Sequence, residues 1–320
     1  NLLTNSGFDV WSNSTLENVT GTNLATAATW TNFSSNPYDT LTVSGANITQ
    51  ADGPSATAYA VSGAGGLTLG KLYKVVVTVT DLSGGSGQMP WFFQSHIYAS
   101  QGTDFAATRL SVGANTFIYE YTQDTYDRLA FQNTDTCDWS ATVVWTEVTP
   151  GCVAADTLAF DGWYKDSTLD IWRQHNDGGT LTHDGSFYAL KVTTSNTNRS
   201  LIWQNALSSK AEFYQQFAGR TVTLGAWVKT STASHAFLRL EDSTGSTDST
   251  THTGGGAWEW LEVTRPIAAA TTLFQAHLRH AITTTDSYWS QPMLVFGSAI
   301  GAGNYSAPSG EIVICESNFN

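Results

Sequence analysis

The sequence has few cysteines, few charged residues and no long apolar run, and each shortage excludes a class of protein. Three cysteines in 320 residues do not form the dense disulfide framework of small secreted domains. No apolar stretch approaches the ~18 residues that a membrane-spanning helix needs, and the opening residues lack the pattern of a signal peptide. Only 14 lysines and arginines face 27 aspartates and glutamates, and the net charge of -13 disfavours nonspecific binding to nucleic acid. We therefore expect neither a nucleic acid nor a membrane as a partner.

The sequence also lacks the motifs that carry most enzyme chemistry. Its seven histidines and three cysteines show no zinc-binding spacing. It contains no G-x-S-x-G elbow, no phosphate-binding Walker loop and no G-x-G-x-x-G after a strand. The glycine run at 254–256 precedes a strand-like segment rather than a helix, which indicates a turn. We therefore predict that the protein is not an enzyme.

What the sequence does contain is a long series of strand signals. Short segments rich in valine, threonine and aromatic residues alternate with clusters of glycine, serine, asparagine and aspartate. Only Ser208–Gly219 places aromatic residues at helical spacing, and we expect it to form one or two turns or a loop. This pattern predicts an all-β fold, an antiparallel sandwich or barrel.

The same order of features occurs twice. GKLYKVVVTVT (Gly70–Thr80) opens one series of strand-like segments, and GRTVTLGAWVK (Gly219–Lys229) opens a similar series in the second half. Each half has the length of one sandwich domain. We therefore predict one domain in residues 1–150 and a second in residues 151–320, meeting near Pro150–Gly151.

Two of the cysteines flank this expected junction. Cys137 and Cys152 either form a disulfide, which leaves Cys315 as a single thiol, or remain thiols themselves. The chain starts at Asn1 without a methionine, so we expect it to be a fragment of a longer protein.

Three stretches resemble a known superfamily. NLLTNSGFDVW at the start is similar to the opening strand of jelly-roll carbohydrate-binding modules of the xylan- and glucan-binding superfamily, which are galactose-binding-like. The block Gly219–Asp242, followed by WEWLEVT, resembles the middle strands of these modules. The ending DSYWSQPMLVFGSAIGAGNYSAPSG is similar to the close of such modules in bacteriophage tail and fibre proteins. The resemblance implies two tandem jelly-roll (β-sandwich) modules, the second with a C-terminal extension.

The resemblance also implies a structural calcium ion. Members of the superfamily often hold calcium between the acid of the opening motif and an aspartate before the last strand. The matching residues are Asp9 and Asp138 in the first half and Asp286 in the second. Calcium requires six to eight oxygen ligands, and the alternative is that these aspartates cap turns.

Strand alternation places polar and aromatic side chains together on single sheet faces. Leu238 and Leu240 are expected in the core, which directs Arg239 and Glu241 to the other side. The same rule applied to the other strands gives a set of candidate ligand-binding residues. This set is Phe92, Gln94, His96, Tyr98, Arg128, Trp227, Arg239, Glu241, Trp260, His277 and Arg279.

This mixture of side chains suits a sugar. A pyranose ring stacks its apolar face on an aromatic ring, and its hydroxyls take hydrogen bonds from arginines, amides and carboxylates. The alternative is an ordinary solvated sheet face or a contact between subunits. Trp258, just after the glycine turn, is expected to be structural, whereas Trp260 is expected to be exposed.

The sequence therefore favours a non-catalytic, glycan-binding attachment region of a phage tail, fibre or other virion-surface protein. Its expected partners are bacterial surface glycans or polysaccharides and other virion subunits, in a homo-oligomer at the virion surface or outside the cell. Two weak sites on one chain would gain avidity. One alternative is a structural decoration or fibre domain that makes subunit contacts without binding sugar. Another is an accessory module of a secreted polysaccharide-degrading enzyme.

Overall fold

The regular secondary structure of the described residues is almost entirely antiparallel β-strand, which confirms the predicted all-β class. The computed structural model describes residues 1–9, 11–12, 14–18, 22–25, 30–32, 40–44, 47–51, 58–84, 90–95, 102–123, 125–133, 137–153, 157–175, 180–183, 186–282 and 285–306. Its one α-helix in this part of the chain, α1 (Ala211–Tyr214), is a single turn within the segment expected to form one or two turns. None of the described helices is long and apolar enough to cross a membrane.

The chain divides into two compact units, and one of them is discontinuous in sequence. We call Asn18–Thr149 the inserted unit, and Asn1–Glu17 together with Pro150–Asn320 the split unit. This division differs from the predicted domains of residues 1–150 and 151–320. The C-terminal boundary of the inserted unit, at Thr149, lies next to the expected junction at Pro150–Gly151. The first 17 residues, however, belong with the C-terminal half.

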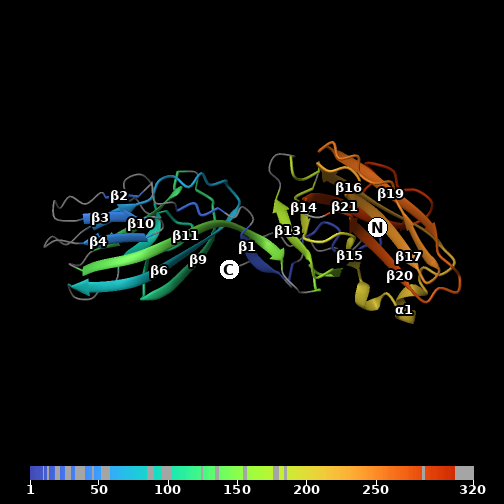
Figure 1. Cartoon of the computed structure of the whole chain (residues 1–320), viewed down its shortest axis with the longest axis horizontal. Coiled ribbons are helices and arrows are strands. Elements are labelled where there is room, and N and C mark those ends of the chain that lie inside the picture. The colour runs from blue at the N-terminus through green and yellow to red at the C-terminus, as the bar shows by residue number, and fades with distance from the viewer. Residues whose placement is uncertain are drawn as a thin grey trace. The chain divides into compact units, whose positions relative to one another are not determined.

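The split unit has two antiparallel sheets (Figure 1). The first has the order β19-β16-β21-β14-β13, and the end of β11 pairs with β13. The second has the order β12-β15-β20-β17-β18. Their bounds are β12 (Trp163–Lys165), β13 (Leu169–His175), β14 (Tyr188–Thr194), β15 (Arg199–Trp203), β16 (Thr221–Thr230), β17 (Ala236–Asp242), β18 (Gly245–Asp248), β19 (Trp258–Pro266), β20 (Phe274–His280) and β21 (Ser287–Phe296), with a 3-10 turn at Asn205–Leu207.

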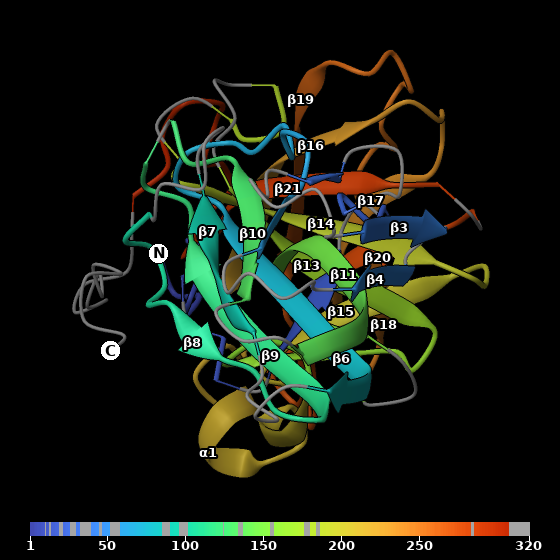
Figure 2. The same cartoon turned by 90° about the vertical axis from the view of Figure 1, so that its left-hand side faces the viewer.

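The inserted unit repeats this two-sheet arrangement. One sheet has the order β3-β4-β11-β6-β9 and the other has the order β2-β5-β10-β7-β8; β7 and β10 lie side by side in Figure 2. The short β1 (Thr15–Asn18) lies at the boundary between the units. The other bounds are β2 (Thr31–Asn32), β3 (Thr40–Ser44), β4 (Asn47–Ala51), β5 (Ala58–Val61), β6 (Leu72–Gly84), β7 (Trp91–Ser95), β8 (Thr108–Arg109), β9 (Gly113–Glu120), β10 (Arg128–Asn133) and β11 (Cys137–Cys152).

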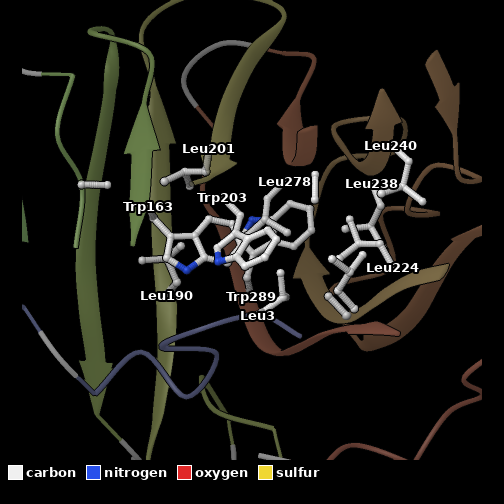
Figure 3. Packing of buried hydrophobic residues seen from close by; sticks show 14 of the residues in the cluster. Leu3, Trp163, Leu190, Leu201, Trp203, Leu224, Leu238, Leu240, Leu278 and Trp289 are labelled. Atoms are coloured by element: carbon white, nitrogen blue, oxygen red, sulfur yellow. The ribbon is translucent and has the colours of Figure 1, made fainter. Parts of the chain in front are cut away.

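Each unit encloses its own apolar core, as a sandwich requires. In the split unit, Trp163, Trp203 and Trp289 lie among the leucines of both sheets (Figure 3). In the inserted unit, Trp139 and Trp145 lie in a separate cluster with the inward valines of β6. Most of the aromatic content of the sequence is therefore used for packing.

The opening segment is part of the split unit's core. Leu3 and Phe8 are fully buried there, and Figure 3 shows Leu3 beside Trp289. The backbone N–H of Leu2 donates to the carbonyl of Leu294 at 2.8 Å, which ties the segment to β21. Because of these contacts, residues 1–17 belong to the split unit and not to the unit formed by Asn18–Thr149.

The sequence left open whether Cys137 and Cys152 form a disulfide or remain thiols, and the structure decides this for Cys152. Cys152 is a buried thiol within the split unit's core cluster and is not joined in a disulfide. The third cysteine, Cys315, lies outside the described residues.

Candidate functional site

The outward face of β17 and β20 in the split unit gathers the polar side chains that alternation predicted. Leu238, Leu240 and Leu278 are fully buried in the core, so their neighbours in sequence point the other way. The register of the two strands pairs Arg239 with His277, and adjacent strands also bring Phe237 opposite Arg279 and Glu241 opposite Gln275. We call these six residues the β17–β20 face: Phe237, Arg239, Glu241, Gln275, His277 and Arg279.

Arg239 is held in a fixed orientation. Its Nε and one terminal nitrogen donate to the two carboxylate oxygens of Asp248 on β18, at 2.6 and 2.8 Å. The hydrogen bond to Asp248 raises the pKa of Arg239, and the same bond lowers the pKa of Asp248. A bidentate pair of this kind restricts the guanidinium, so the remaining donors of Arg239 have a defined direction.

Arg279 is the second cation of the face, and it makes no ion pair with any described residue. One terminal nitrogen donates to the Ser200 hydroxyl at 2.7 Å, and its guanidinium carbon lies 5.8 Å from the centre of the Phe237 ring. Burial lowers the pKa of Arg279, and Arg239 nearby lowers it further. The guanidinium therefore has unused donors beside an aromatic ring.

His277 lies between the two arginines and is uncharged. Its side chain is almost completely buried, and neither ring nitrogen has a hydrogen-bond partner in the described structure. Burial, then Arg279 and Arg239, lower the pKa of His277 to about 3. The Glu241 carboxylate lies 3.7 Å from Nε2, too far for a hydrogen bond.

The face therefore offers donors and acceptors on one surface, whereas the Phe237 ring beside Arg279 is buried. Two guanidinium groups and the amide of Gln275 supply donors, and the Glu241 carboxylate supplies acceptors. The Gln275 amide also donates to the Asn205 side-chain oxygen at 2.7 Å, which fixes its direction.

We expect His277 to make the folded chain less stable in mild acid. Its pKa of about 3 in the folded chain lies below the ~6.5 of an unfolded histidine. The stabilisation is therefore complete above about pH 6.5 and is lost as the pH falls toward the folded value. Between pH 7 and pH 5, the wild type should lose about 2 kcal/mol more unfolding free energy than His277→Gln, measured by urea unfolding. Equal losses in both proteins would contradict the burial of a neutral His277.

The inserted unit does not bring together the residues predicted there. Phe92 and Gln94 were predicted on an outward face, and this orientation is wrong because both are fully buried. Phe92 packs against Phe131 in the core, with ring centres 5.0 Å apart. The Gln94 amide donates to Asp104 and to a backbone carbonyl, at 2.8 Å each.

The other predicted residues of the inserted unit form no group with them. Arg128 lies on the side of the sheet opposite to Phe92 and Gln94. Its guanidinium donates to the backbone carbonyl of Ser62 at 3.0 Å. His96 and Tyr98 lie outside the described residues. The orientation was predicted wrongly because apolar clusters cover both sides of β7. Polar and apolar residues therefore do not alternate along this strand.

Trp227 and Trp260 lie on the first sheet of the split unit, away from the β17–β20 face. They are cross-strand partners on β16 and β19. Trp260 is half-buried, and its indole nitrogen donates to Glu262 at 2.9 Å. The sequence could not show that these two tryptophans and Arg239 lie on different sheets, because strand alternation does not reveal which strands are neighbours.

The predicted calcium residues are distributed over both units. Asp9 belongs to the split unit and Asp138 to the inserted unit. Burial raises the pKa of Asp9, although Arg173 opposes this, and Asp286 pairs with Lys191 at 3.0 Å. No group of three or more metal-ligating side chains occurs among the described residues, so calcium stays a prediction.

Sequence reasoning missed the side chains that neighbouring strands add to the β17–β20 face. Ser200 and Ile202 of β15 stand opposite Arg279 and His277, and Tyr164 of β12 stands opposite Ile202. Asp248 on β18 was also missed. Each of these residues occupies an outward position on its own strand. Only the pairing of the strands shows that they extend the β17–β20 face.

Several solved structures resemble this chain, whereas no family model and no curated protein matches it. One is the tandem CBM22-1–CBM22-2 domain of Paenibacillus barcinonensis Xyn10C, with 12% identity, a TM-score of 0.33 and coverage of 88% of this chain and 97% of that one. The C-terminal family 22 carbohydrate binding module of Clostridium thermocellum Xyn10B has 14% identity and a TM-score of 0.30, covering 42% of this chain and 86% of the module. The enzymatically active domain of bacteriophage CBA120 tailspike protein 4 has 11% identity and a TM-score of 0.30, covering 42% of this chain and 19% of that one. Similarity at this level does not identify a ligand.

Proposed function

We propose that the chain is a non-catalytic carbohydrate-binding region whose ligand site is the β17–β20 face of the split unit. The observation that carries this proposal is the pair of guanidinium groups, Arg239 held by Asp248 and Arg279 without an ion pair among the described residues, on one sheet face with the Glu241 carboxylate. Sugar hydroxyls are both donors and acceptors, so they suit a surface that offers arginine donors and a Glu241 carboxylate together.

We further propose that this binding attaches a phage virion to bacterial surface glycan. The support is the resemblance of the closing segment, DSYWSQPMLVFGSAIGAGNYSAPSG, to the close of such modules in phage tail and fibre proteins. In that setting the chain would be exposed at the virion surface, in a homo-oligomer with other virion subunits. An accessory module of a secreted polysaccharide-degrading enzyme would use the same face, and the full-length gene separates the two, since an adjoining catalytic domain supports the latter.

Replacing Arg279 is expected to weaken glycan binding with little effect on folding. Arg279→Ala removes donors that have no carboxylate partner, and a lost charged hydrogen bond corresponds to a roughly tenfold to hundredfold weaker affinity. The measurement is a glycan array followed by affinity electrophoresis of the full chain in each polysaccharide that binds. Arg220→Ala is the matched control, because Arg220 lies against Phe296 just before β16 and is exposed.

Two outcomes would count against the proposed function. One is that no glycan retards the intact chain. The other is that Arg220→Ala weakens retardation as much as Arg279→Ala, which would indicate a general charge effect. If Arg279 and Phe237 are instead buried between subunits of a stable oligomer, the structural alternative without sugar binding is favoured.

A further inference from the structure

The tryptophans that are not buried are concentrated on one surface of the split unit. Of the 12 tryptophans in the sequence, seven are buried, namely Trp11, Trp30, Trp139, Trp145, Trp163, Trp203 and Trp289. Four of the other five lie on β13, β16 and β19, on strands of the same sheet: Trp172, Trp227, Trp258 and Trp260. Large rings are rarely left at a surface in such numbers without a partner.

Three aromatic residues and two lysines form one continuous row across that sheet. The strand registers pair Trp258 with Lys229, Lys229 with Tyr288, Tyr288 with Lys191, and Lys191 with Trp172. Directly paired residues of antiparallel strands project from the same side of the sheet. We call these five residues the aromatic row. Rings and ammonium groups therefore alternate along the strand order β19-β16-β21-β14-β13.

The aromatic row faces away from the core. Val228 and Trp289, which flank Lys229 and Tyr288 along their strands, are fully buried in the core cluster. The members of the row are each half-buried, and the indole nitrogens of Trp172 and Trp258 are on the buried part. The row therefore lies on the outer side of the first sheet, whereas the β17–β20 face is the outer side of the second.

Neighbouring side chains hold the rings of this surface in place. His183 stacks on Trp227 with ring centres 4.0 Å apart and meets Trp258 edge to face at 5.7 Å. The Lys191 ammonium lies 5.2 Å from the centre of the Trp172 ring and also pairs with Asp286. The rings are thus fixed before any ligand arrives, which lowers the entropic cost of binding.

The spacing of the row suits an extended polysaccharide. Adjacent strands are ~4.8 Å apart, so rings on every second strand recur at ~10 Å. In an extended β-1,4-linked chain, sugar rings lie nearly flat and the structure repeats after every second ring, a period of the same order. The Lys229 ammonium donates to the Thr180 carbonyl and the Lys191 ammonium pairs with Asp286. Each ammonium has three donors, so each keeps donors for the hydroxyls of the intervening sugars.

We propose that the aromatic row is a second binding surface, which takes the flat side of an extended β-1,4-linked polysaccharide. It differs from the β17–β20 face in its residues, its sheet and the form of its ligand. The first surface binds individual sugars through directed hydrogen bonds, whereas the second contacts several rings of one chain by stacking. Two surfaces on one unit would increase retention on a solid polysaccharide through avidity.

The test is retention of the full chain on insoluble polysaccharide. The chain is mixed with microcrystalline cellulose and, separately, with chitin powder, and the protein left in solution is measured. We expect retention on at least one of them, a decrease of at least tenfold in the partition coefficient for Trp258→Ala and for Tyr288→Ala, and near-normal retention for Trp258→Phe. Phe187→Ala is the matched control, because Phe187 is the most exposed of the large hydrophobic residues described in the split unit and lies outside the row.

Footprinting makes the test independent of how well the variants fold. Hydroxyl-radical labelling of the unmodified chain should decrease at Trp258 and Tyr288 when the polysaccharide is present, and should not change at Phe187. The proposal is overturned if neither polysaccharide retains the chain, if Phe187→Ala reduces retention as much as Trp258→Ala, or if the labelling of the row is unchanged. It is also overturned if the row variants only dissociate a dimer in sedimentation, since the surface would then be a contact with a second copy.

The same experiments separate this surface from the β17–β20 face. Arg279→Ala should lose retardation by soluble glycan and keep its retention on the solid. Trp258→Ala should show the reverse. Failure of the first result with success of the second would remove the proposed function and leave the aromatic row as the binding surface.

Discussion

Phe8→Ala is expected to destabilise the split unit by about 3–5 kcal/mol, although position 8 lies more than 140 residues before the second segment of that unit, Pro150–Asn320. Phe8 is fully buried, and its ring meets the Phe160 ring edge to face with centres 5.3 Å apart. The Trp11 ring also packs against the Phe160 ring, with ring centres 5.0 Å apart. Removing the Phe8 ring leaves a cavity among side chains that strands on both sheets hold in place.

Hydrogen exchange resolved by peptide measures this effect in each unit separately. In Phe8→Ala, protection should fall in peptides of residues 157–306 and remain near wild-type levels in peptides of residues 58–84. Phe131→Ala is the matched control, because Phe131 is fully buried in the core of the inserted unit. It should give the opposite pattern. Loss of protection only within residues 58–149 after Phe8→Ala would show that the opening segment packs with the first half of the chain.

Asp242→Ala is expected to cost a similar amount, about 3–5 kcal/mol, because it removes a fully buried carboxylate and leaves the largely buried Arg265, whose side chain is 13% exposed, without its ion pair. The Asp242 carboxylate is fully buried at the end of β17 and accepts from Arg265 at 2.7 Å. It also accepts from the Thr244 backbone at 2.8 Å and from the Ala268 backbone at 3.0 Å. The carboxylate therefore joins the β17–β18 hairpin to the chain that follows β19.

Urea unfolding of Asp242→Ala beside Asp248→Ala tests this expectation. Asp248 also pairs with an arginine, but its carboxylate is 40% exposed, and pairs of that kind contribute less than about 1 kcal/mol. Replacing both Asp242 and Arg265 by leucine should recover much of the loss, because neither charge is then buried alone. Equal effects of Asp242→Ala and Asp248→Ala would contradict the buried pair.

The pH dependence of the Asp242 effect follows from its pKa. Burial raises the pKa of Asp242, but the hydrogen bonds from Arg265, Thr244 and Ala268 outweigh burial and hold it well below its ordinary value. A carboxyl with a lowered pKa stabilises the fold above the unfolded value of ~3.9, and this stabilisation is lost as the pH falls below it. The difference between wild type and Asp242→Ala should therefore shrink only below about pH 4.

Strand alternation predicted the β17–β20 face because both strands are covered on one side only. Leu238 and Leu278 face the core while Arg239 and Arg279 face outward, so polar and apolar positions alternate in the sequence. The same rule failed for Phe92 and Gln94, because apolar clusters cover both sides of β7. A strand buried on both sides carries no alternation from which its orientation can be read.

The aromatic row could not be predicted from the sequence. Trp258, Tyr288 and Trp172 lie on three strands that are separated by up to 116 positions in the chain. Each is recognisable as a residue of a strand, but the row exists only because β16 lies between β19 and β21, and β14 lies between β21 and β13. Strand order and register arise from packing of the whole sandwich, not from local preference.

The sequence by itself determined that this chain is built from antiparallel β-strands in two units, and it determined the inward and outward sides of the strands with one solvated side. Both properties are local, since they depend on β-propensity, turn residues and a period of two. The tertiary structure alone decided that residues 1–17 complete the C-terminal unit and which strands are neighbours. These are long-range properties, because the burial of Phe8 against Phe160 is a contact between residues that no local pattern connects.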